Sequence, residues 1–477
     1  MSRWQDKNWV NKMNLRFDYS QMMAESIGPE HGITESEIQK LMPRVNGIAA
    51  DINKRRAAGE LGFYDLPNNP ASAKEVSELA ESLRAKCEDL VVLGIGGSAL
   101  GGIALCRALC HPLHNLLSQA ERKGAPRVFF LDNIDPLTCR AVFEKVNLEK
   151  SVFAVITKSG NTAETLSQFL IVRKLLEQKL GRAAAKDHLV IITGERPNSL
   201  RTLAEKAEYT TLSIPQNVGG RFSVLSPVGL FPAAMLGIDI FELLAGAGYI
   251  AKRCSSKSLR QNPAYLAGVL HYLGDVKKGL DIAVVMPYSD ALYQVGFWFR
   301  QIWAESLGKA DDVSGKKVYA GQTPVVALGA TDQHSQLQLY TEGPFNKMVT
   351  FLRVENHGAA LRIPRAAEKD YAYLGGHTLG ELINIEARAT QMALTRAGRS
   401  SMSLTLPELN PFTIGELLFM LEVQTVFTAG LYNVNPLDQP GVESSKRYIQ
   451  GMMGRPGFEK ETQEAANRRQ QSKRFSI

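Results

Sequence analysis

The sequence has few cysteines, only five in 477 residues, and they are scattered along the chain. An odd, scattered set argues against the disulfide framework that stabilises small secreted domains. The first residues, MSRWQDKNWVNKMN, are polar and lack the apolar core of a secretory signal. We therefore expect a cytoplasmic protein.

The sequence also lacks a strong excess of charge and a long apolar run. The 55 Lys and Arg against 48 Asp and Glu give a net charge of +7, too small over this length to indicate a nucleic-acid-binding surface. No stretch reaches the roughly 18 uninterrupted apolar residues that a membrane helix needs. The longest candidate, 223–250, is broken by Pro227, Pro232, Asp239 and Glu242. These absences favour a globular protein that binds neither nucleic acid nor membrane.

What the sequence does contain is a series of short, continuous apolar runs separated by helical segments. Such runs are typical of parallel strands buried on both faces. They occur at 89–96, 127–134, 151–158, 187–194 and 209–215, and again at 280–290, 323–332 and 347–356. A long apolar helical region at 225–250 separates the two groups. The pattern predicts an α/β protein with two layered units in tandem, linked near 216–260.

A glycine-rich loop follows the first apolar run, in VVLGIGGSALGG at 91–102. Gly94 and Gly96 partly match a dinucleotide-binding fingerprint, but Glu121 comes too early to be the acidic residue expected at the end of the second strand. No Lys follows the glycines, which argues against a nucleoside triphosphate loop. A phosphate-binding loop and a glycine turn used only for close packing both remain open.

A second loop, ITKSGNTAETL at 156–166, ends the third apolar run. Thr157, Ser159 and Thr162 place three hydroxyls before a predicted helix, and Lys158 adds a positive charge. Hydroxyls and backbone N–H groups at a helix N-terminus suit a compact phosphate monoester. The alternative is an ordinary Ser/Thr helix cap.

Two charged side chains are candidates for acid–base and electrostatic catalysis. Arg221 follows Gly219-Gly220, where its guanidinium can stabilise a developing oxyanion. Glu305 follows an aromatic-rich stretch, whose side chains would shield a general base from water. A structural Arg and an exposed Glu at a helix end are the alternatives.

Two further groups carry weaker signals. His334 lies at the start of a helix in GATDQHSQLQLY, and Lys446 follows an ordered Asn-Pro and Gln-Pro-Gly turn; a surface histidine and a Glu443–Lys446 surface pair are the alternatives. The stretch CRALCHPLH at 106–114 has the composition of a zinc site. However, Cys106 and Cys110 fall on the apolar face of a helix that ends at His111-Pro112, which leaves His114 in a different frame. We expect buried thiols and no metal site.

Six segments in this order resemble the phosphoglucose isomerase family: GIGGSALGG, TKSGNTAET, GGRFSVLSPVG, AESLGK, DQHSQ and NPLDQPGVESSK. They span residues 94–446. The resemblance implies two αβα sugar-isomerase (SIS) domains, each with a mainly parallel five-stranded sheet, plus N-terminal helices and a C-terminal helical tail. The implied boundaries are 1–65 for the N-terminal helical region, 66–240 and 241–430 for the two SIS domains, and 431–477 for the C-terminal segment.

The resemblance also implies a reaction and a site. The expected activity is the interconversion of glucose 6-phosphate and fructose 6-phosphate, in glycolysis and gluconeogenesis, through a cis-enediolate. Glu305 would be the base, Arg221 would stabilise the enediolate, and His334 and Lys446 would open and close the sugar ring. The residues implied to bind substrate are Gly97, Ser98, Thr157, Lys158, Ser159, Thr162, Glu164, Gln301 and Gln439. A homodimer is implied, with His334 donated across the interface, and neither cofactor nor metal is needed.

The sequence departs from the family pattern at three places, Gln216, Leu307 and Leu437. None of the three replaces a group needed for the chemistry, since the proposed base, cation and proton carriers are all present. The departures leave substrate preference open, so mannose 6-phosphate is an alternative to glucose 6-phosphate. Two different functions also stay open, that of a non-catalytic sugar-phosphate-binding regulator and that of an NAD-dependent dehydrogenase. A regulator does not need a base, and a dehydrogenase would rest on the glycine loop alone.

Overall fold

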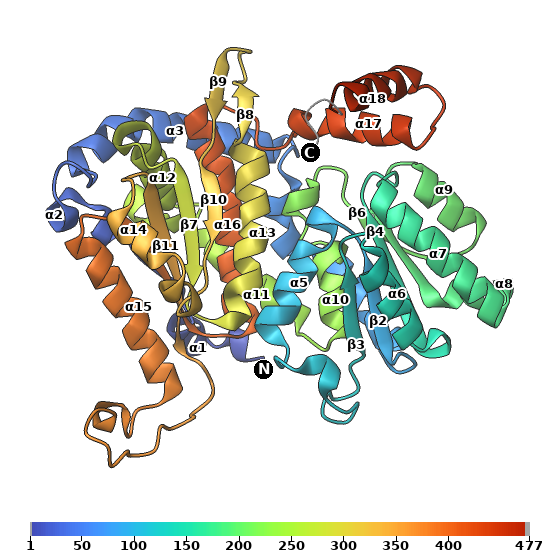
Figure 1. The fold of residues 1–477 in the computed structure, drawn as a ribbon, viewed down its shortest axis with the longest axis horizontal. Helices are drawn as coiled ribbons and strands as arrows, with labels where there is room; N and C mark the ends of the chain where they lie inside the picture. The colour runs from blue at the N-terminus through green and yellow to red at the C-terminus, as the bar shows by residue number, and fades with distance from the viewer. Residues whose placement is uncertain (1, 473–477) are drawn as a thin grey trace.

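The computed structural model describes residues 2–472 of the chain. The first residue of the expected N-terminal region, and residues 473–477 at the end of the expected C-terminal segment, lie outside the described residues. Two α/β units lie side by side, each built on a five-stranded sheet (Figure 1). This arrangement confirms the predicted fold class.

The first sheet is parallel throughout, in the order β3-β2-β4-β5-β6. Every residue of β2, β4 and β5 is buried, which explains why these runs are continuously apolar. All five runs predicted in the first half of the chain are strands. Their bounds are β2 Asp89–Leu93, β3 Arg127–Leu131, β4 Ser151–Thr157, β5 Leu189–Gly194 and β6 Thr210–Ile214.

Helices cover both faces of this sheet. One face packs on α4 (Pro70–Arg84), α5 (Leu100–Leu109) and α10 (Pro227–Met235), and the other on α6 (Pro136–Lys145), α7 (Ala163–Leu180) and α9 (Ser199–Lys206). A short helix, α8 (Arg182–Ala185), follows α7. Side chains of Asn69, Asp135, Asn198 and Ser226 accept backbone N–H bonds at the starts of α4, α6, α9 and α10. Local capping signals in the sequence therefore determine where these helices begin.

The second sheet has the order β1-β12-β11-β7-β10 and is parallel except for β1. The three predicted runs are β7 (Ile282–Pro287), β10 (Thr323–Val326) and β11 (Lys347–Asn356). Two strands were not predicted. One is β12 (Ser401–Glu408), whose residues alternate between polar and apolar, and the other is β1 (Arg16–Asp18), a three-residue edge strand in the region expected to be helical. Antiparallel pairing of β1 with β12 attaches the N-terminal region to the second sheet.

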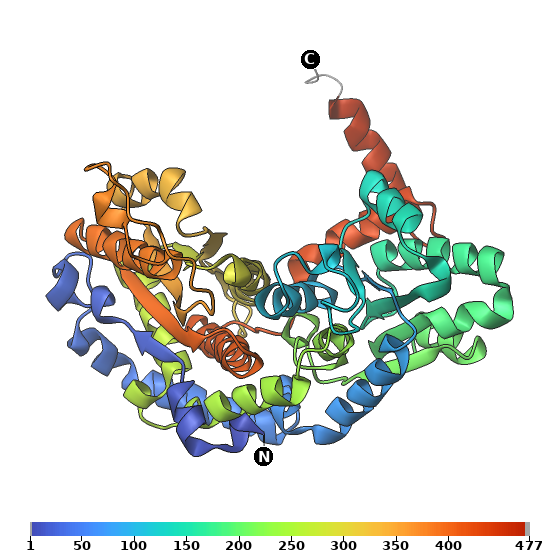
Figure 2. The ribbon, with the colours of Figure 1, turned by 90° about the horizontal axis from the view of Figure 1, so that it is seen from below.

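The helices of the N-terminal region and second unit surround this sheet. They are α1 (Lys7–Lys12), α2 (Ala24–Ile27), α3 (Glu35–Ala57), α11 (Ile240–Arg253), α12 (Pro263–Lys278), α13 (Asp290–Leu307), α14 (Leu337–Glu342), α15 (Leu379–Arg396) and α16 (Pro411–Tyr432). A hairpin of β8 (Lys309–Asp311) and β9 (Lys317–Ala320) follows α13. The C-terminal helices are α17 (Glu443–Met452) and α18 (Glu459–Ser472), and Figure 2 shows α18 projecting beyond the first unit.

Helix α16 forms the centre of the molecule, where it packs on α11, α12 and α13. Within residues 2–472 it is the one helix long and apolar enough to cross a membrane, but 94% of its most apolar window is buried inside the protein. Its sequence does not form one continuous apolar run, because Glu416, Glu422 and Gln424 interrupt it. Burial on all sides, rather than lipid, accounts for its composition.

Candidate active site

A cavity of about 660 Å³ lies where the carboxyl ends of β2 and β4 face α13 and the C-terminal segment. Ligands of open α/β sheets bind at such strand ends. Most of the predicted site residues line it: Gly97, Ser98, Thr157, Lys158, Ser159, Thr162, Arg221, Gln301, Glu305, Gln439 and Lys446. The tertiary structure thus brings together groups that lie as far apart as residues 97 and 446 in the sequence.

The glycine loop after β2 forms one wall of the cavity. Gly96 has a φ of +58°, in the left-handed region that favours glycine. A Cβ on Gly97 would lie 2.3 Å from the carbonyl oxygen of Gly220, so this glycine allows the two glycine loops to touch. Close packing therefore accounts for Gly97, and Ser98 lines the cavity beside it.

The loop after β4 gathers three hydroxyls. Thr157 Oγ1 lies 2.8 Å from Thr162 Oγ1 and 3.5 Å from Ser159 Oγ. Thr162 is the N-cap residue of α7, yet its side chain makes no capping hydrogen bond. The alternative of an ordinary helix cap is therefore wrong for Thr162. Its hydroxyl instead faces Thr157 beside the positive end of an 18-residue helix, which suits an anion.

Lys158 links this loop to the segment that precedes Arg221. Its Nζ donates to the carbonyl oxygens of Gln216 and Val218, both at 2.7 Å. Burial lowers the pKa of Lys158, and the carboxylate of Glu195 opposes that shift. The ammonium group thus lines the cavity with two of its three donors already used.

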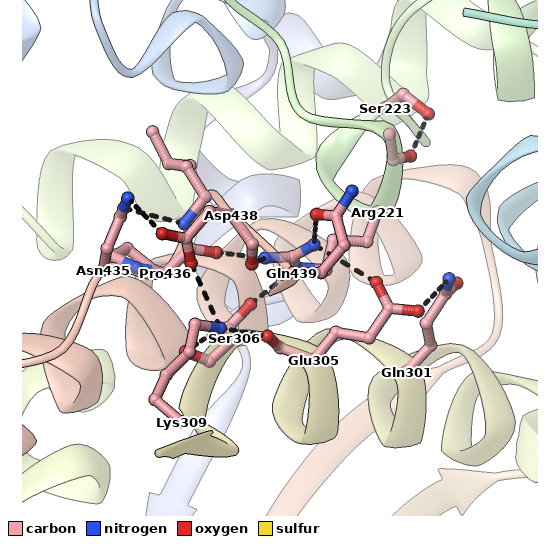
Figure 3. Close-up of polar contacts among 12 residues, drawn as sticks. Arg221, Ser223, Gln301, Glu305, Ser306, Lys309, Asn435, Pro436, Asp438 and Gln439 are labelled. Carbon is pink, nitrogen blue, oxygen red and sulfur yellow. Dashed lines mark hydrogen bonds and ion pairs between the residues drawn. The ribbon is translucent and has the colours of Figure 1, made fainter. Parts of the chain in front are cut away.

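Arg221 is the most firmly held side chain of the site, with only 5% of its surface exposed. Its acceptors are Ser306 Oγ (2.8 Å from Nε), Glu305 Oε2 (3.1 Å from Nη1), Gln439 Oε1 (2.9 Å from Nη1), the carbonyl oxygen of Asp438 (2.9 Å from Nη2) and that of Pro436 (Figure 3). Burial lowers the pKa of Arg221, and the carboxylates of Glu305 and Asp438 act in the opposite direction. The guanidinium therefore faces the cavity in one fixed orientation.

Glu305 lies in the last turn of α13, and its carboxylate is held by two neighbours. Oε2 accepts from Arg221, and Oε1 accepts from Gln301 Nε2 at 3.0 Å (Figure 3). The aromatic side chains expected around it do not supply its contacts, since Trp298, Phe299 and Trp303 are buried in the main core. One third of the Glu305 side chain stays exposed, on the cavity side. A carboxylate oriented by a cation and an amide at a cavity wall can accept a proton from a bound ligand.

Gln301 also lines the cavity, and only one end of its amide group is hydrogen-bonded to the described residues. Its Nε2 is bonded to Glu305, whereas its Oε1 is buried and accepts no hydrogen bond from the described residues. The amide group of Gln301 also lies directly against the glycine loop, 2.9 Å from the position of a Cβ on Gly96. Its side chain therefore joins the wall formed by α13 to the wall formed by the glycine loop.

Three of the predicted residues lie outside the cluster of side chains around Arg221 and Glu305. Lys446 is exposed on α17 at the cavity edge, and its Nζ donates to Glu443 Oε1 at 2.7 Å, the surface pair that was the alternative. His334 is exposed at the end of a 3-10 helix, Thr331–His334, and does not line the cavity. Glu164 is half-buried in the first turn of α7, also outside the lining.

Sequence reasoning missed the groups that hold Arg221 from behind. Ser306 is buried and accepts from Arg221, and Lys309 is buried beside it. Both lie in the AESLGK segment, in which the sequence indicated a role for Glu305 alone. The carbonyl oxygens of Pro436 and Asp438 had no signal at all, because backbone acceptors carry no sequence signature.

The CRALCHPLH stretch does not gather its four side chains. Cys106 is buried in α5, and Cys110 ends that helix. His114 Nε2 lies 2.8 Å from the carbonyl oxygen of Pro126, and His111 Nδ1 accepts from the backbone of Leu113. Throughout residues 2–472, no three His, Cys, Asp or Glu side chains are grouped so that they could hold a metal ion.

Comparison with known proteins places the chain in a known family. The family model described as phosphoglucose isomerase matches residues 80–466. A glucose-6-phosphate isomerase of Carboxydothermus hydrogenoformans is 44% identical over 95% of this chain and 97% of its own, and one of Rubrobacter xylanophilus is 42% identical over 93% and 99%. Among solved structures, a hypothetical protein of Thermus thermophilus has a TM-score of 0.82 at 33% identity, over 92% of this chain and all of its own. A glucose-6-phosphate isomerase of Chlamydia trachomatis has a TM-score of 0.72 at 25% identity, over 83% of this chain and 76% of its own. The chain belongs to the phosphoglucose isomerase family.

Proposed function

We propose that this protein interconverts glucose 6-phosphate and fructose 6-phosphate through a cis-enediolate, with Glu305 as the base. One observation carries the proposal: the oriented Glu305–Arg221 pair and the Thr157–Thr162 hydroxyl cluster line one cavity. A phosphate held by the hydroxyls would anchor an open-chain sugar whose other end reaches the carboxylate. Fixing both ends in this way converts the proton transfer into an intramolecular step.

The proton-transfer step uses the Glu305–Arg221 pair. Glu305 takes the proton from C2 of the open-chain aldose, and the C–H electron pair forms the C1–C2 double bond of the enediolate. Arg221 stabilises the negative charge that develops on the substrate oxygens, because its guanidinium is already oriented and needs no reorganisation. Glu305 then returns the proton to C1 while the proton on O2 passes to O1, so the C1–C2 double bond becomes the C2 carbonyl of the ketose. The phosphate stays on Ser98, Thr157, Lys158, Ser159 and Thr162 throughout.

Ring opening requires a second set of groups. The proton of the C1 hydroxyl must leave and a proton must reach the ring oxygen as the C1–O5 bond breaks. We assign these transfers to Lys446 and to His334 of a second copy of the chain, in a homodimer. Support for the second copy is that His334 is exposed and lies outside the cavity of its own chain.

The Glu305–Arg221 pair also bears on the class of function. A sugar-phosphate-binding regulator would need the hydroxyl cluster but not an oriented carboxylate, so the Glu305–Arg221 pair favours an enzyme. Measuring isomerisation of mannose 6-phosphate beside glucose 6-phosphate decides between the two substrates.

We also propose that the protein acts in the cytoplasm, because its five cysteines are unpaired thiols, as in proteins of reducing compartments.

Replacing the base tests the mechanism. Glu305→Gln should lower kcat by about 10²–10⁴-fold, the usual contribution of a positioned general base, with KM changed little. A matched control is Glu78→Gln, in an exposed pair with Lys74 on α4, which should leave both constants unchanged. Near-normal turnover of Glu305→Gln would show that another group is the base.

Mixing two inactive variants tests the shared site. Glu305→Gln and His334→Gln chains, refolded together, should recover about a quarter of the wild-type activity. Half of the randomly formed dimers are then mixed, and each mixed dimer has one complete site. A mixture that stays inactive, while wild-type protein refolds to full activity, would place His334 in its own chain's site or outside the mechanism.

A further inference from the structure

Lys309 is a buried cation that the reaction described above does not use. It is the first residue of β8, directly after Gly308 ends α13, and only 5% of its side chain is exposed. Its Nζ donates to the carbonyl oxygens of Glu305 and Ser306, the latter at 3.2 Å. The last carbonyls of a helix have no partner within the helix and form the negative end of its dipole. Lys309 therefore satisfies and neutralises the end of the helix that carries Glu305.

The same ammonium group also reaches the C-terminal segment. Lys309 Nζ lies 3.7 Å from the carboxylate oxygen Oδ1 of Asp438, as Figure 3 shows. The main-chain carbonyl of Asp438 in turn accepts from Arg221 Nη2, and its neighbour Gln439 accepts from Nη1. Lys309 thus contacts both structural pieces that hold Arg221, namely the end of α13 through hydrogen bonds and the 436–439 loop through the ion pair with Asp438.

Lys309 itself is separated from the proposed substrate. It does not line the 660 Å³ cavity, but lines a second cavity of about 490 Å³ together with Asp438, Arg55 and Glu60. Burial and the charge of Arg221 lower the pKa of Lys309, while Asp438 and Glu305 oppose this shift. Two cations and two carboxylates therefore form one cluster, in which Arg221 and Glu305 face the substrate cavity and Lys309 does not.

We infer that Lys309 is a positioning residue for the reaction: by contacting both the end of α13 and the 436–439 loop, it fixes the positions of Glu305 and Arg221 relative to each other. The inference rests on the proposed function, since it concerns the geometry of that base and that cation. Losing these contacts of Lys309 would let the end of α13 and the 436–439 loop move apart. A misplacement of about 1 Å at reacting groups can cost about 10²-fold in rate.

Substituting Lys309 tests this role through the separation of kcat from KM. Lys309→Met should lower kcat by about 10–100-fold, with KM changed by less than about threefold, because the hydroxyl cluster that binds phosphate does not contact Lys309. Lys309→Arg, which keeps the charge, should recover part of the lost kcat. The matched control is Lys317→Met, which removes an exposed partner of Asp311 on the adjoining strand and should change neither constant.

Asp438→Asn supplies a second test that does not disturb the core, since half of its side chain is exposed. This change removes the carboxylate but keeps the main-chain carbonyl that binds Arg221. It should lower kcat in the same direction, and the Lys309→Met/Asp438→Asn double variant should be about as slow as the slower single variant. An Asp438→Asn variant with unchanged kcat would overturn the inference even if Lys309→Met failed to fold. Where Lys309→Met folds, effects that multiply in the double variant would overturn it as well.

Glu305→Gln separates the positioning role from the proposed function. An inactive Glu305→Gln together with a fully active, folded Lys309→Met would overturn the positioning role and leave the proposed function standing. An active Glu305→Gln would overturn the proposed base, whatever Lys309→Met does. Binding of sorbitol 6-phosphate, measured by calorimetry, should be similar in wild-type protein and Lys309→Met. A large loss of that affinity would assign Lys309 to substrate binding and overturn the inference.

Discussion

Arg221 and Lys446 line the same cavity, but the structure holds their charges in opposite ways. Arg221 is buried and donates to five acceptors from two segments of the chain, the end of α13 and the 436–439 loop. Lys446 is exposed on α17 and pairs with Glu443, three residues away on the same helix. The region around Arg221 is thus organised before any ligand arrives, whereas Lys446 has to leave a surface pair to act.

The difference suits the two tasks assigned to these cations. Stabilising an enediolate benefits from a charge that is fixed in advance, since reorganisation during the reaction costs rate. Assisting ring opening requires a group that can approach one substrate atom and then withdraw. Buried and exposed charges should therefore respond differently to substitution, and three measurements test that difference.

The largest effect is expected at Arg221. Arg221→Lys should lower kcat/KM by about 10²–10³-fold, because an ammonium group with three donors cannot satisfy five acceptors in a planar fork. The isomerase assay measures kcat/KM. The control is Arg140→Lys, in an exposed pair with Glu144, which should leave kcat/KM unchanged. A folded Arg221→Lys variant with wild-type kinetics would show that the fixed geometry is irrelevant to the rate.

An intermediate effect is expected from buried titratable groups outside the cavity lining. Burial raises the pKa of Glu416 on α16 from 4.5 to about 8, and lowers that of His271 from 6.5 to about 4. A raised carboxyl pKa means that the folded protein keeps a proton that the unfolded chain releases, so stability falls between pH 4.5 and 8. The lowered pKa of His271 has the opposite sign, and its contribution ends near pH 6.5.

The free energy of unfolding should therefore fall between pH 6.5 and 8, with Glu416 contributing about 2 kcal/mol of the loss. Urea denaturation at the two pH values measures it. Glu416→Gln should reduce this pH dependence of the free energy of unfolding without abolishing it, because burial also raises the pKa of Glu422. An unchanged pH dependence in the variant would show that Glu416 is ionised in the folded protein.

The smallest effect is expected at Lys446. Lys446→Met should lower kcat/KM by about tenfold, less than the usual contribution of about 10²–10⁴-fold from a proton-transfer group because ring opening is shared with His334, and leave Tm within about a degree because its surface ion pair contributes little. Lys74→Met removes a comparable exposed pair on α4 and is the control for both readings. A loss as large as that of Arg221→Lys would mean that substrate binding fixes Lys446 as firmly as burial fixes Arg221.

The parts of the site that follow strand ends were predictable from the sequence. Ser98, Thr157, Ser159 and Thr162 come directly after β2 and β4, and parallel strands bring their carboxyl ends to one edge. The environment of Glu305 was not predictable in the same way. Its aromatic neighbours in sequence lie on the core side of α13, so helical periodicity directs them away from the carboxylate.

Sequence alone determined the positions of most buried strands, most helix starts and the chemical groups available for the reaction, because apolar runs and capping residues act over a few positions. The way these groups are held depends on the tertiary structure. The acceptors of Arg221 include Ser306 and the carbonyls of Pro436 and Asp438, which lie 85 to 217 residues from it in the chain. Backbone carbonyls are the same at every residue. Which of them meet a buried cation therefore depends on how α13 and the C-terminal segment pack, and no local pattern of residues encodes that packing.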